Sequence, residues 1–316
     1  MDPVTHLLAG AAVGNAFCRN RLGDKAAPIV MAASLLPDID VLAHLAGAEG
    51  ILWRRTVGHS LYVLPLLAAV LAWGIKNWKF KHHGFWTLYW PILLGCGVHL
   101  ILDLINSFGV VLLWPLDDWR PELAITFIID LFLAGSLALP LLLAWPRRWR
   151  SRAEGLSRLG LIAASFYLLL CGTGRSMALL TMSRELSRLG IKPDFVYVFP
   201  EPYGPLRWRG VLRAGGIYRL YLITPFRDLL EPKGEIETLA GDPRVEAVRR
   251  TEIGRRLDGF FKAPVWTVRP GATFGLPDDP VEVTVRDLRF TSLLVDRRSP
   301  FQFRFLVRPD GIVQPL

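Results

Sequence analysis

Long apolar runs, separated by short charged segments, make up most of the first 182 residues. A helix needs about 20 apolar residues to cross a bilayer. Four runs reach or approach this length, and they cover residues 61–75, 85–105, 123–145 and 159–180. Two shorter apolar stretches, 4–17 and 26–36, predict helices that enter the membrane partway or pack against the spans. The pattern predicts a mostly α-helical membrane domain, a helical bundle, over residues 1–182.

The pattern changes after residue 182. Stretches such as KPDFVYVFPEP, GIYRLYLITP, VEVTVRDLRF and FQFRFLV are rich in aromatic and β-branched residues and alternate partly between apolar and polar positions. Proline and glycine separate these stretches, as is typical of short strands joined by turns. Residues 183–316 therefore predict a β-rich soluble domain, in which we find no catalytic motif and no internal repeat.

Composition supports a membrane protein. The chain is 52% hydrophobic with a mean hydropathy of +0.33, and the apolar excess lies in residues 1–182. A net charge of +9 would suit a nucleic-acid partner. However, the basic residues of the first part cluster between apolar runs, in segments 19–25, 76–83 and 147–152, as membrane orientation requires. The expected partner is the lipid bilayer, and no nucleic acid is expected.

The cysteine spacing and the N-terminal segment bear on two further questions, namely the chemistry of the cysteines and the route of membrane insertion. Three cysteines without CxxC spacing indicate neither a zinc ribbon nor a disulfide framework. No secretory signal peptide is recognisable, so insertion through the internal spans is expected.

The distribution of Lys and Arg also predicts an orientation. The three basic segments alternate along the chain with segments 37–50 and 109–119, which are poor in basic residues. If the basic segments are cytoplasmic in a bacterial inner membrane, the polar candidates described below and the C-terminal domain lie on the non-cytoplasmic side. Arg54 and Arg55 do not fit this rule, which indicates a role other than orientation.

Histidine and aspartate recur at positions where a membrane segment normally has neither. Residues 84–102 contain no Asp, Glu, Lys or Arg, yet the run ends in His99 and then Asp103, one helical turn apart. Ionisable groups in such segments usually mark functional sites. Asp2 and His6 repeat the four-residue spacing. With the PDID motif and a histidine ahead of the span at 61–75, the candidate metal ligands are Asp2, His6, Asp38, Asp40, His59, His99 and Asp103.

This residue set indicates a divalent metal. Imidazole and carboxylate without thiolate suit Zn²⁺, Mn²⁺ or Fe²⁺. Seven candidates exceed the four ligands of a tetrahedral zinc, so one to three ions are expected, zinc first among them. Each residue alone has a simpler explanation: PDID can be a helix stop followed by a cap, and Asp2 can lie in a frayed terminus. Asp130 either lines the site or neutralises an arginine such as Arg175.

Four ordered motifs carry a family resemblance: MDPVTHLLAGAAVG, LLPDID, RRTVGHSL and GCGVHLILDLINSFGVVLLWP. Over about residues 1–135 the chain resembles the membrane-bound metal-dependent hydrolase family, the YdjM-like group. The resemblance implies a helical metal site distantly similar to that of zinc-dependent phospholipase C, and hydrolysis of phosphoesters. It implies metal ligation by His6, Asp38, Asp40, His59, His99 and Asp103, with Asp2 as a further ligand.

The chain departs from the family pattern at one position. Relatives usually have His-Arg before the His-Ser element, where this chain has Arg54 and Arg55. If the missing histidine is a ligand in relatives, this chain holds one metal fewer or uses another group such as His44.

The expected reaction assigns catalytic roles to Asp38, Asp103 and Arg55. Asp38 or Asp103 would accept a proton from a metal-activated water, and Arg55, with Arg54, would bind the phosphate by bidentate hydrogen bonds. A metal or proton transporter and a non-catalytic, metal-stabilised membrane scaffold remain as alternatives.

Overall fold

The computed structural model describes the chain except for residues 47–49, 51–52, 271–279 and 296–300. Contacts divide the chain into two compact units. The first unit contains Met1–Gly174 with Pro202–Pro205, and the second contains Arg175–Glu201 with Leu206–Leu316. The division falls inside one long helix, α7 (Ala153–Leu189).

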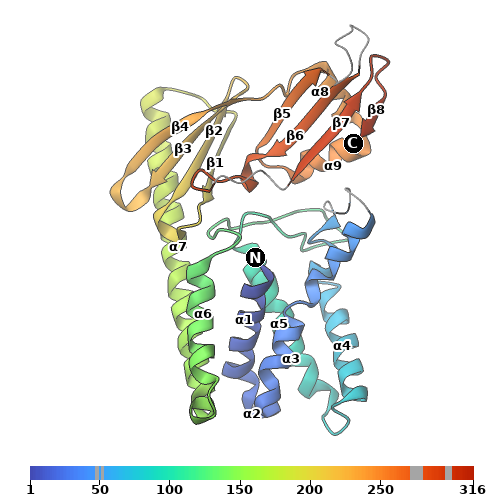
Figure 1. The fold of residues 1–316 in the computed structure, drawn as a ribbon, viewed down its shortest axis with the longest axis vertical. Coiled ribbons are helices and arrows are strands. Elements are labelled where there is room, and N and C mark those ends of the chain that lie inside the picture. The colour runs from blue at the N-terminus through green and yellow to red at the C-terminus, as the bar shows by residue number, and fades with distance from the viewer. Residues whose placement is uncertain (47–49, 51–52, 271–279, 296–300) are drawn as a thin grey trace. The chain divides into compact units, whose positions relative to one another are not determined.

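The first unit is helical, as the sequence predicts (Figure 1). Its elements are α1 (Pro3–Val13), a π-helical turn η1 (Gly14–Cys18), α2 (Arg19–Leu22), η2 (Gly23–Lys25), α3 (Ala26–Ala33), the 3-10 segments η3 (Leu36–Ala46) and η5 (Val57–His59), α4 (Leu64–Trp78), α5 (Phe85–Leu104), α6 (Leu131–Ala144), η6 (Arg147–Arg152) and the first part of α7.

Small residues allow α3 to pack closely against two neighbouring helices. A Cβ atom added at Gly10 of α1 would lie 2.6 Å from the Ser34 Oγ atom, just after α3. A Cβ atom at Gly95 of α5 would lie 2.8 Å from the Val30 carbonyl oxygen of α3. Small side chains let helix backbones approach in membrane proteins. This packing brings α1 and α5, the two helices with the Asp/His spacing, against the same partner.

Within the described part of the chain, two helical segments are long and apolar enough to cross a membrane, namely Phe85–Leu104 and Arg148–Leu189. The other two predicted spans are shorter than expected: α4 has 15 residues and α6 has 14. In the predicted span 123–145, the helix begins only at Leu131. The reason is Asp130, whose carboxylate accepts hydrogen bonds from the backbone N–H groups of Phe132 and Leu133 and so caps the helix.

Asp130 therefore has a structural role in the first unit. Besides capping α6, its carboxylate accepts hydrogen bonds from the Tyr167 hydroxyl of α7, at 2.7 and 2.9 Å. The side chain is fully buried. Arg175, the other partner considered from the sequence, lies over the Tyr197 ring instead. Asp130 thus fixes the start of α6 against α7.

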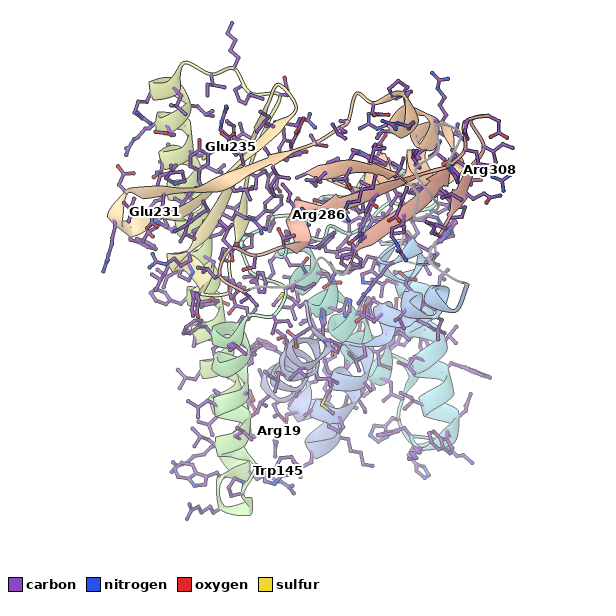
Figure 2. All side chains as sticks on the ribbon, turned by 45° about the horizontal axis from the view of Figure 1, so that its top comes forward. Arg19, Trp145, Glu231, Glu235, Arg286 and Arg308 are labelled. Carbon is purple, nitrogen blue, oxygen red and sulfur yellow. The ribbon has the colours of Figure 1, made fainter. Side chains whose placement is uncertain are left out.

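The two ends of the first unit differ in chemistry. Helices α1, α4 and α6 begin, and α5 ends, at the end where the N-terminus lies (Figure 1). The basic segments lie at the opposite end, where Figure 2 labels Arg19 and Trp145. Tryptophans at that end are exposed, with Trp145 at 81% and Trp78 at 74%. Exposed tryptophan beside basic residues is typical of a membrane–water interface.

The second unit contains two antiparallel four-stranded sheets, which confirms the β-rich prediction. The first sheet has the order β1 (Phe195–Pro200), β2 (Trp208–Ala214), β3 (Ile217–Thr224) and β4 (Leu229–Glu237). The second has the order β5 (Pro264–Pro270), β6 (Val281–Asp287), β7 (Gln302–Val307) and β8 (Val313–Pro315). Helices α8 (Pro243–Arg250) and α9 (Glu252–Phe260), which the strand pattern did not predict, lie between the sheets in the chain.

Local chemistry explains the strand connections and the core of this unit. Gly215 and Gly216 both have positive φ, which suits the tight turn between β2 and β3.

The core of the second unit contains two tryptophans, Trp208 and Trp266, which are fully buried. Burial lowers the pKa of the Arg209 guanidinium, an effect opposed by Glu201, which lies 3.6 Å away.

Candidate metal centre

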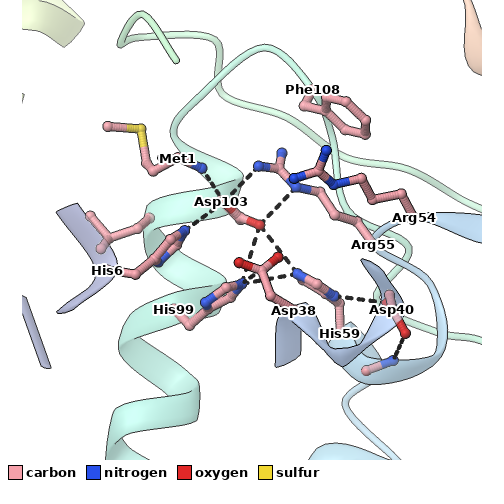
Figure 3. Close-up of polar contacts among 12 residues, drawn as sticks. Met1, His6, Asp38, Asp40, Arg54, Arg55, His59, His99, Asp103 and Phe108 are labelled. Atoms are coloured by element: carbon pink, nitrogen blue, oxygen red, sulfur yellow. Dashed lines mark hydrogen bonds and ion pairs between the residues drawn. The ribbon is translucent and has the colours of Figure 1, made fainter. Parts of the chain in front are cut away.

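Four acidic and histidine side chains converge at the end of the first unit that is opposite the basic segments. They are Asp38, His59, His99 and Asp103, and each can direct one ligand atom to within 4.8 Å of the others (Figure 3). Asp38 comes from η3, His59 from η5, and the remaining two from α5. Segments far apart in the sequence therefore meet at one point.

The local folding of these segments explains the convergence. Residues 99 and 103 lie four apart in α5 and so share one helix face. Gly58 brings η5 against η3, because a Cβ atom at this position would lie 2.2 Å from the Pro37 carbonyl oxygen. Only glycine permits this approach. It places His59 beside the carboxylates of the PDID motif.

Hydrogen bonds fix the tautomers of two histidines. His99 Nδ1 lies 2.7 Å from the Ser34 carbonyl oxygen, and His59 Nδ1 lies 3.1 Å from Asp40 Oδ2. Since these oxygens only accept hydrogen bonds, both Nδ1 atoms act as donors, and a lone pair on each Nε2 atom is then available to a cation. The two Nε2 atoms are 3.0 Å apart, and they lie 3.2 and 3.3 Å from Asp103 Oδ2. Three electron-rich atoms converging in this way favour a bound cation.

His6 adds an unsatisfied donor set at the same place. Its ring stacks on that of His99 with centroids 3.8 Å apart, and its Nε2 atom lies 3.2 Å from Asp103 Oδ1. Both ring nitrogens are buried and have no hydrogen-bond partner among the described residues. Buried polar atoms normally find a partner. An orphaned imidazole beside the cluster therefore fits a metal ion.

The structure places the other two predicted ligands differently. The Asp2 carboxylate caps α1, accepting hydrogen bonds from the backbone N–H group and hydroxyl of Thr5 at 3.0 and 2.6 Å. Asp40 accepts hydrogen bonds from the backbone N–H groups of Thr56 and Gly58, as well as contacting His59. Of the seven predicted ligands, five lie together: His6, Asp38, His59, His99 and Asp103. The side chain of His44 lies outside the described part of the chain.

Replacement of Asp40 by alanine is expected to weaken metal affinity by about 10- to 100-fold without changing the number of bound ions. Carboxylates that orient ligating histidines typically contribute this much, and Asp40 contacts the Nδ1 atom of His59. Metal titration of purified protein measures the effect, with Asp24→Ala at an exposed site as the control. Complete loss of one ion in Asp40→Ala would instead make Asp40 a direct ligand.

The Arg55 side chain is buried beside the cluster and forms an ion pair with Asp103. Its Nε and Nη2 atoms each lie 2.8 Å from one oxygen of Asp103, and its Nη1 atom donates to Asn106 Oδ1 at 3.1 Å. The side chain is 2% exposed and stacks over the Phe108 ring at 4.4 Å. Its backbone has φ of 59°, in the left-handed region that a non-glycine residue rarely adopts. A predicted phosphate-binding arginine is thus paired with a predicted metal ligand.

Sequence reasoning missed three groups of the site. The Met1 amino group contacts Asp103, Asn106 binds Arg55, and the Ser34 carbonyl holds His99. Asn106 follows Asp103 by three residues, just after α5 ends at Leu104, so its closeness to Asp103 was detectable from the spacing. A backbone carbonyl leaves no such signal.

Comparison with known protein families gave a match that covers the first unit. The model of the family described as YdjM inner membrane protein matches residues 1–178. The chain belongs to the YdjM inner membrane protein family. The match includes every residue of the candidate metal centre and ends within α7. No match was found among curated proteins or among solved structures.

Proposed function

We propose that the first unit of this YdjM-family protein is a metal-dependent hydrolase of phosphoesters. The observation that supports the proposal is the approach of the His59 and His99 Nε2 atoms to 3.0 Å beside Asp103. Two neutral imidazoles in this arrangement direct lone pairs at one point, and a divalent cation would satisfy them.

The donor set favours zinc, with manganese or iron as alternatives. His59, His99 and Asp103 supply three nitrogen or oxygen ligands for a tetrahedral zinc ion, which leaves the fourth position to a water molecule, and Asp38 lies beside this position. His6 is the residue available to a second ion, because its Nδ1 atom has no hydrogen-bond partner among the described residues and its Nε2 atom lies 3.2 Å from Asp103. One to three ions remain the expectation, and two are favoured because paired ions suit phosphoester chemistry.

A bound divalent ion would supply Lewis-acid activation of a water molecule. Asp38 is the carboxylate best placed to accept the proton. Its side chain is 23% exposed, with one oxygen 3.9 Å from His99 Nε2, and no hydrogen bond to it is found among the described residues. Asp103, the other candidate base, is held by Arg55 through both oxygens. Arg55 therefore stabilises Asp103 in its charged form and positions it.

Membrane topology supports a site on the non-cytoplasmic side. The basic segments, which favour the cytoplasm, lie at the end of the first unit opposite the cluster. Helix α7 starts at the basic end and is long enough to span. The second unit follows it and would therefore leave the membrane on the side of the cluster.

Turnover of phosphoesters by purified full-length protein tests the proposal. Zinc-loaded protein is expected to cleave at least one member of a panel of phosphomonoesters and phosphodiesters, lipids included. Chelation should abolish turnover, and zinc should restore it. In Asp38→Asn turnover should fall by about 100-fold or more, since a general base typically contributes 10²–10⁴-fold. Absence of turnover with every member of the panel, in protein that contains metal, would contradict the proposal.

One observation favours a second candidate, a non-catalytic site that stabilises the helices. The Arg55–Asp103 ion pair joins the segment just before η5 to α5, so this cluster contributes contacts that hold the helical unit together. If metal removal unfolds the protein and no ester is cleaved, this structural role replaces the catalytic one. A transporter finds less support, since the cluster lies at one end of the helices rather than along them.

A further inference from the structure

Arg54 is a cation without a counter-ion beside the metal centre. No carboxylate lies within ion-pair distance of its guanidinium in the described part of the chain, and its buried Nε atom has no hydrogen-bond partner. The guanidinium lies 5.9 Å from the Phe108 ring, on which Arg55 also stacks (Figure 3). Asp103 neutralises Arg55, whereas no described carboxylate pairs with Arg54. Two guanidinium groups at one ring therefore favour an anion at this place.

The segments around the site expose an apolar rim. Its members are Ile39, Val41, Trp53, Leu61, Leu116 and Trp119, which are exposed by 41–76%. Exposed apolar side chains in a continuous patch usually mark an interaction surface.

Hydrogen bonds connect the rim segments to each other. Leu61 N donates to the Leu112 carbonyl oxygen at 2.9 Å, and Val111 N donates to that of Arg55 at 2.9 Å. The Arg120 side chain donates to the Arg54 carbonyl oxygen at 3.2 Å. The segment after α5 is thereby attached to the segment that contains both arginines. The rim and the unpaired cation belong to one local structure.

The place of this rim in the fold indicates a lipid. Its Leu116 and Trp119 follow the C-terminal end of α5, a helix long enough to span the bilayer in an inner membrane protein family, and Leu61 is hydrogen-bonded to the same segment at Leu112. Trp and apolar side chains at that depth contact the boundary between head groups and acyl chains. A ligand held there by both features needs an anionic group and hydrocarbon chains.

We propose that Arg54 binds the phosphate of a membrane-borne phospholipid substrate, whose acyl chains contact the apolar rim. This inference rests on the proposed function and names its substrate class, an acylated glycerol phosphoester. Arg54 acts as the residue that recognises the anion, while Arg55 positions Asp103.

Binding of a non-hydrolysable lipid tests the proposal. The probes are the phosphonate analogues of dihexanoyl phosphatidic acid, of glycerol 3-phosphate, which lacks acyl chains, and of dihexanoyl phosphatidylcholine. Metal-loaded full-length protein in detergent should bind the acylated phosphonate at least about tenfold more tightly than the glycerol analogue, because buried CH₂ groups contribute to affinity. The protein should also bind the phosphatidic acid analogue more tightly than the phosphatidylcholine analogue, because the choline group places a positive charge beside the anionic group.

Two variants separate the parts of the proposal. Arg54→Gln should weaken binding of the acylated phosphonate about tenfold, the loss expected for one charge-assisted hydrogen bond. Arg21→Gln, an exposed cation at the opposite end, should not change it. Trp119→Ser should weaken the acylated probe and leave the glycerol analogue unchanged. Unfolding temperatures of all variants in detergent confirm that the binding losses are local.

Equal affinity of wild type and Arg54→Gln, or no preference for acyl chains, would overturn this inference. Either outcome in protein that binds metal and cleaves a soluble phosphoester would leave the proposed function intact. Protein that binds no metal and cleaves nothing would instead contradict the proposed function.

Discussion

Replacement of Asp103 by alanine should lower the free energy of unfolding of the first unit by about 3–5 kcal/mol, the range observed when one member of a buried ion pair is removed. Arg55 is 2% exposed and two of its nitrogen atoms lie 2.8 Å from the Asp103 oxygens, so the variant would remove the carboxylate that pairs with a buried guanidinium. Denaturation of detergent-purified, metal-free protein, followed by circular dichroism, measures the change.

Removal of both charges provides the matched control. Arg55→Met combined with Asp103→Leu keeps similar volumes and removes both members of this ion pair, so much of the stability should return, as it does when apolar residues replace buried ion pairs. A loss below about 1 kcal/mol in the single variant would show that Arg55 finds another partner or reaches water.

Replacement of His99 by alanine should abolish stoichiometric metal binding in conditions where the wild-type protein retains its ion. His99 contributes one of the two facing Nε2 atoms, and its orientation is fixed by Ser34. Loss of one of three protein ligands leaves an incomplete site, for which we expect at least about a 100-fold loss of affinity. Elemental analysis after dialysis measures the metal content.

His82 is the control for this experiment, since it is exposed in the basic segment at the opposite end. His82→Ala should retain the wild-type metal content. His6→Ala should lose only a second ion, because His6 lies outside the group of four converging side chains. Retention of all metal in His99→Ala would place the metal elsewhere in the chain.

Spacing within one helix was the most informative feature of the sequence. The four-residue interval between His99 and Asp103 predicts a shared face, and the structure shows it. The same interval between Asp2 and His6 was less informative, because a carboxylate at a helix N-terminus can cap the backbone instead of facing the cluster. Local spacing cannot distinguish these roles, since they depend on whether the residue lies inside the helix or before it.

Tertiary contacts decide the remainder of the site. The positive φ of Arg55 and the approach of Gly58 to Pro37 bring η5 onto η3 and α5, and neither produces a periodic signal. For the same reason the sequence did not show that Arg55 pairs with Asp103 while Arg54 has no counter-ion. The start of α6 was predicted too early because apolar residues continue upstream of Asp130, which ends the pattern only through its cap.

The crowding around Asp103 has a thermodynamic consequence. Its two oxygens contact Arg55, the Met1 amino group and three histidines. An arriving cation must compete with the guanidinium for these oxygens, so the measured affinity is the difference between two binding free energies. Metal binding and the position of the Arg55 side chain are therefore coupled. A signal that reports the position of this side chain would also report how much metal is bound.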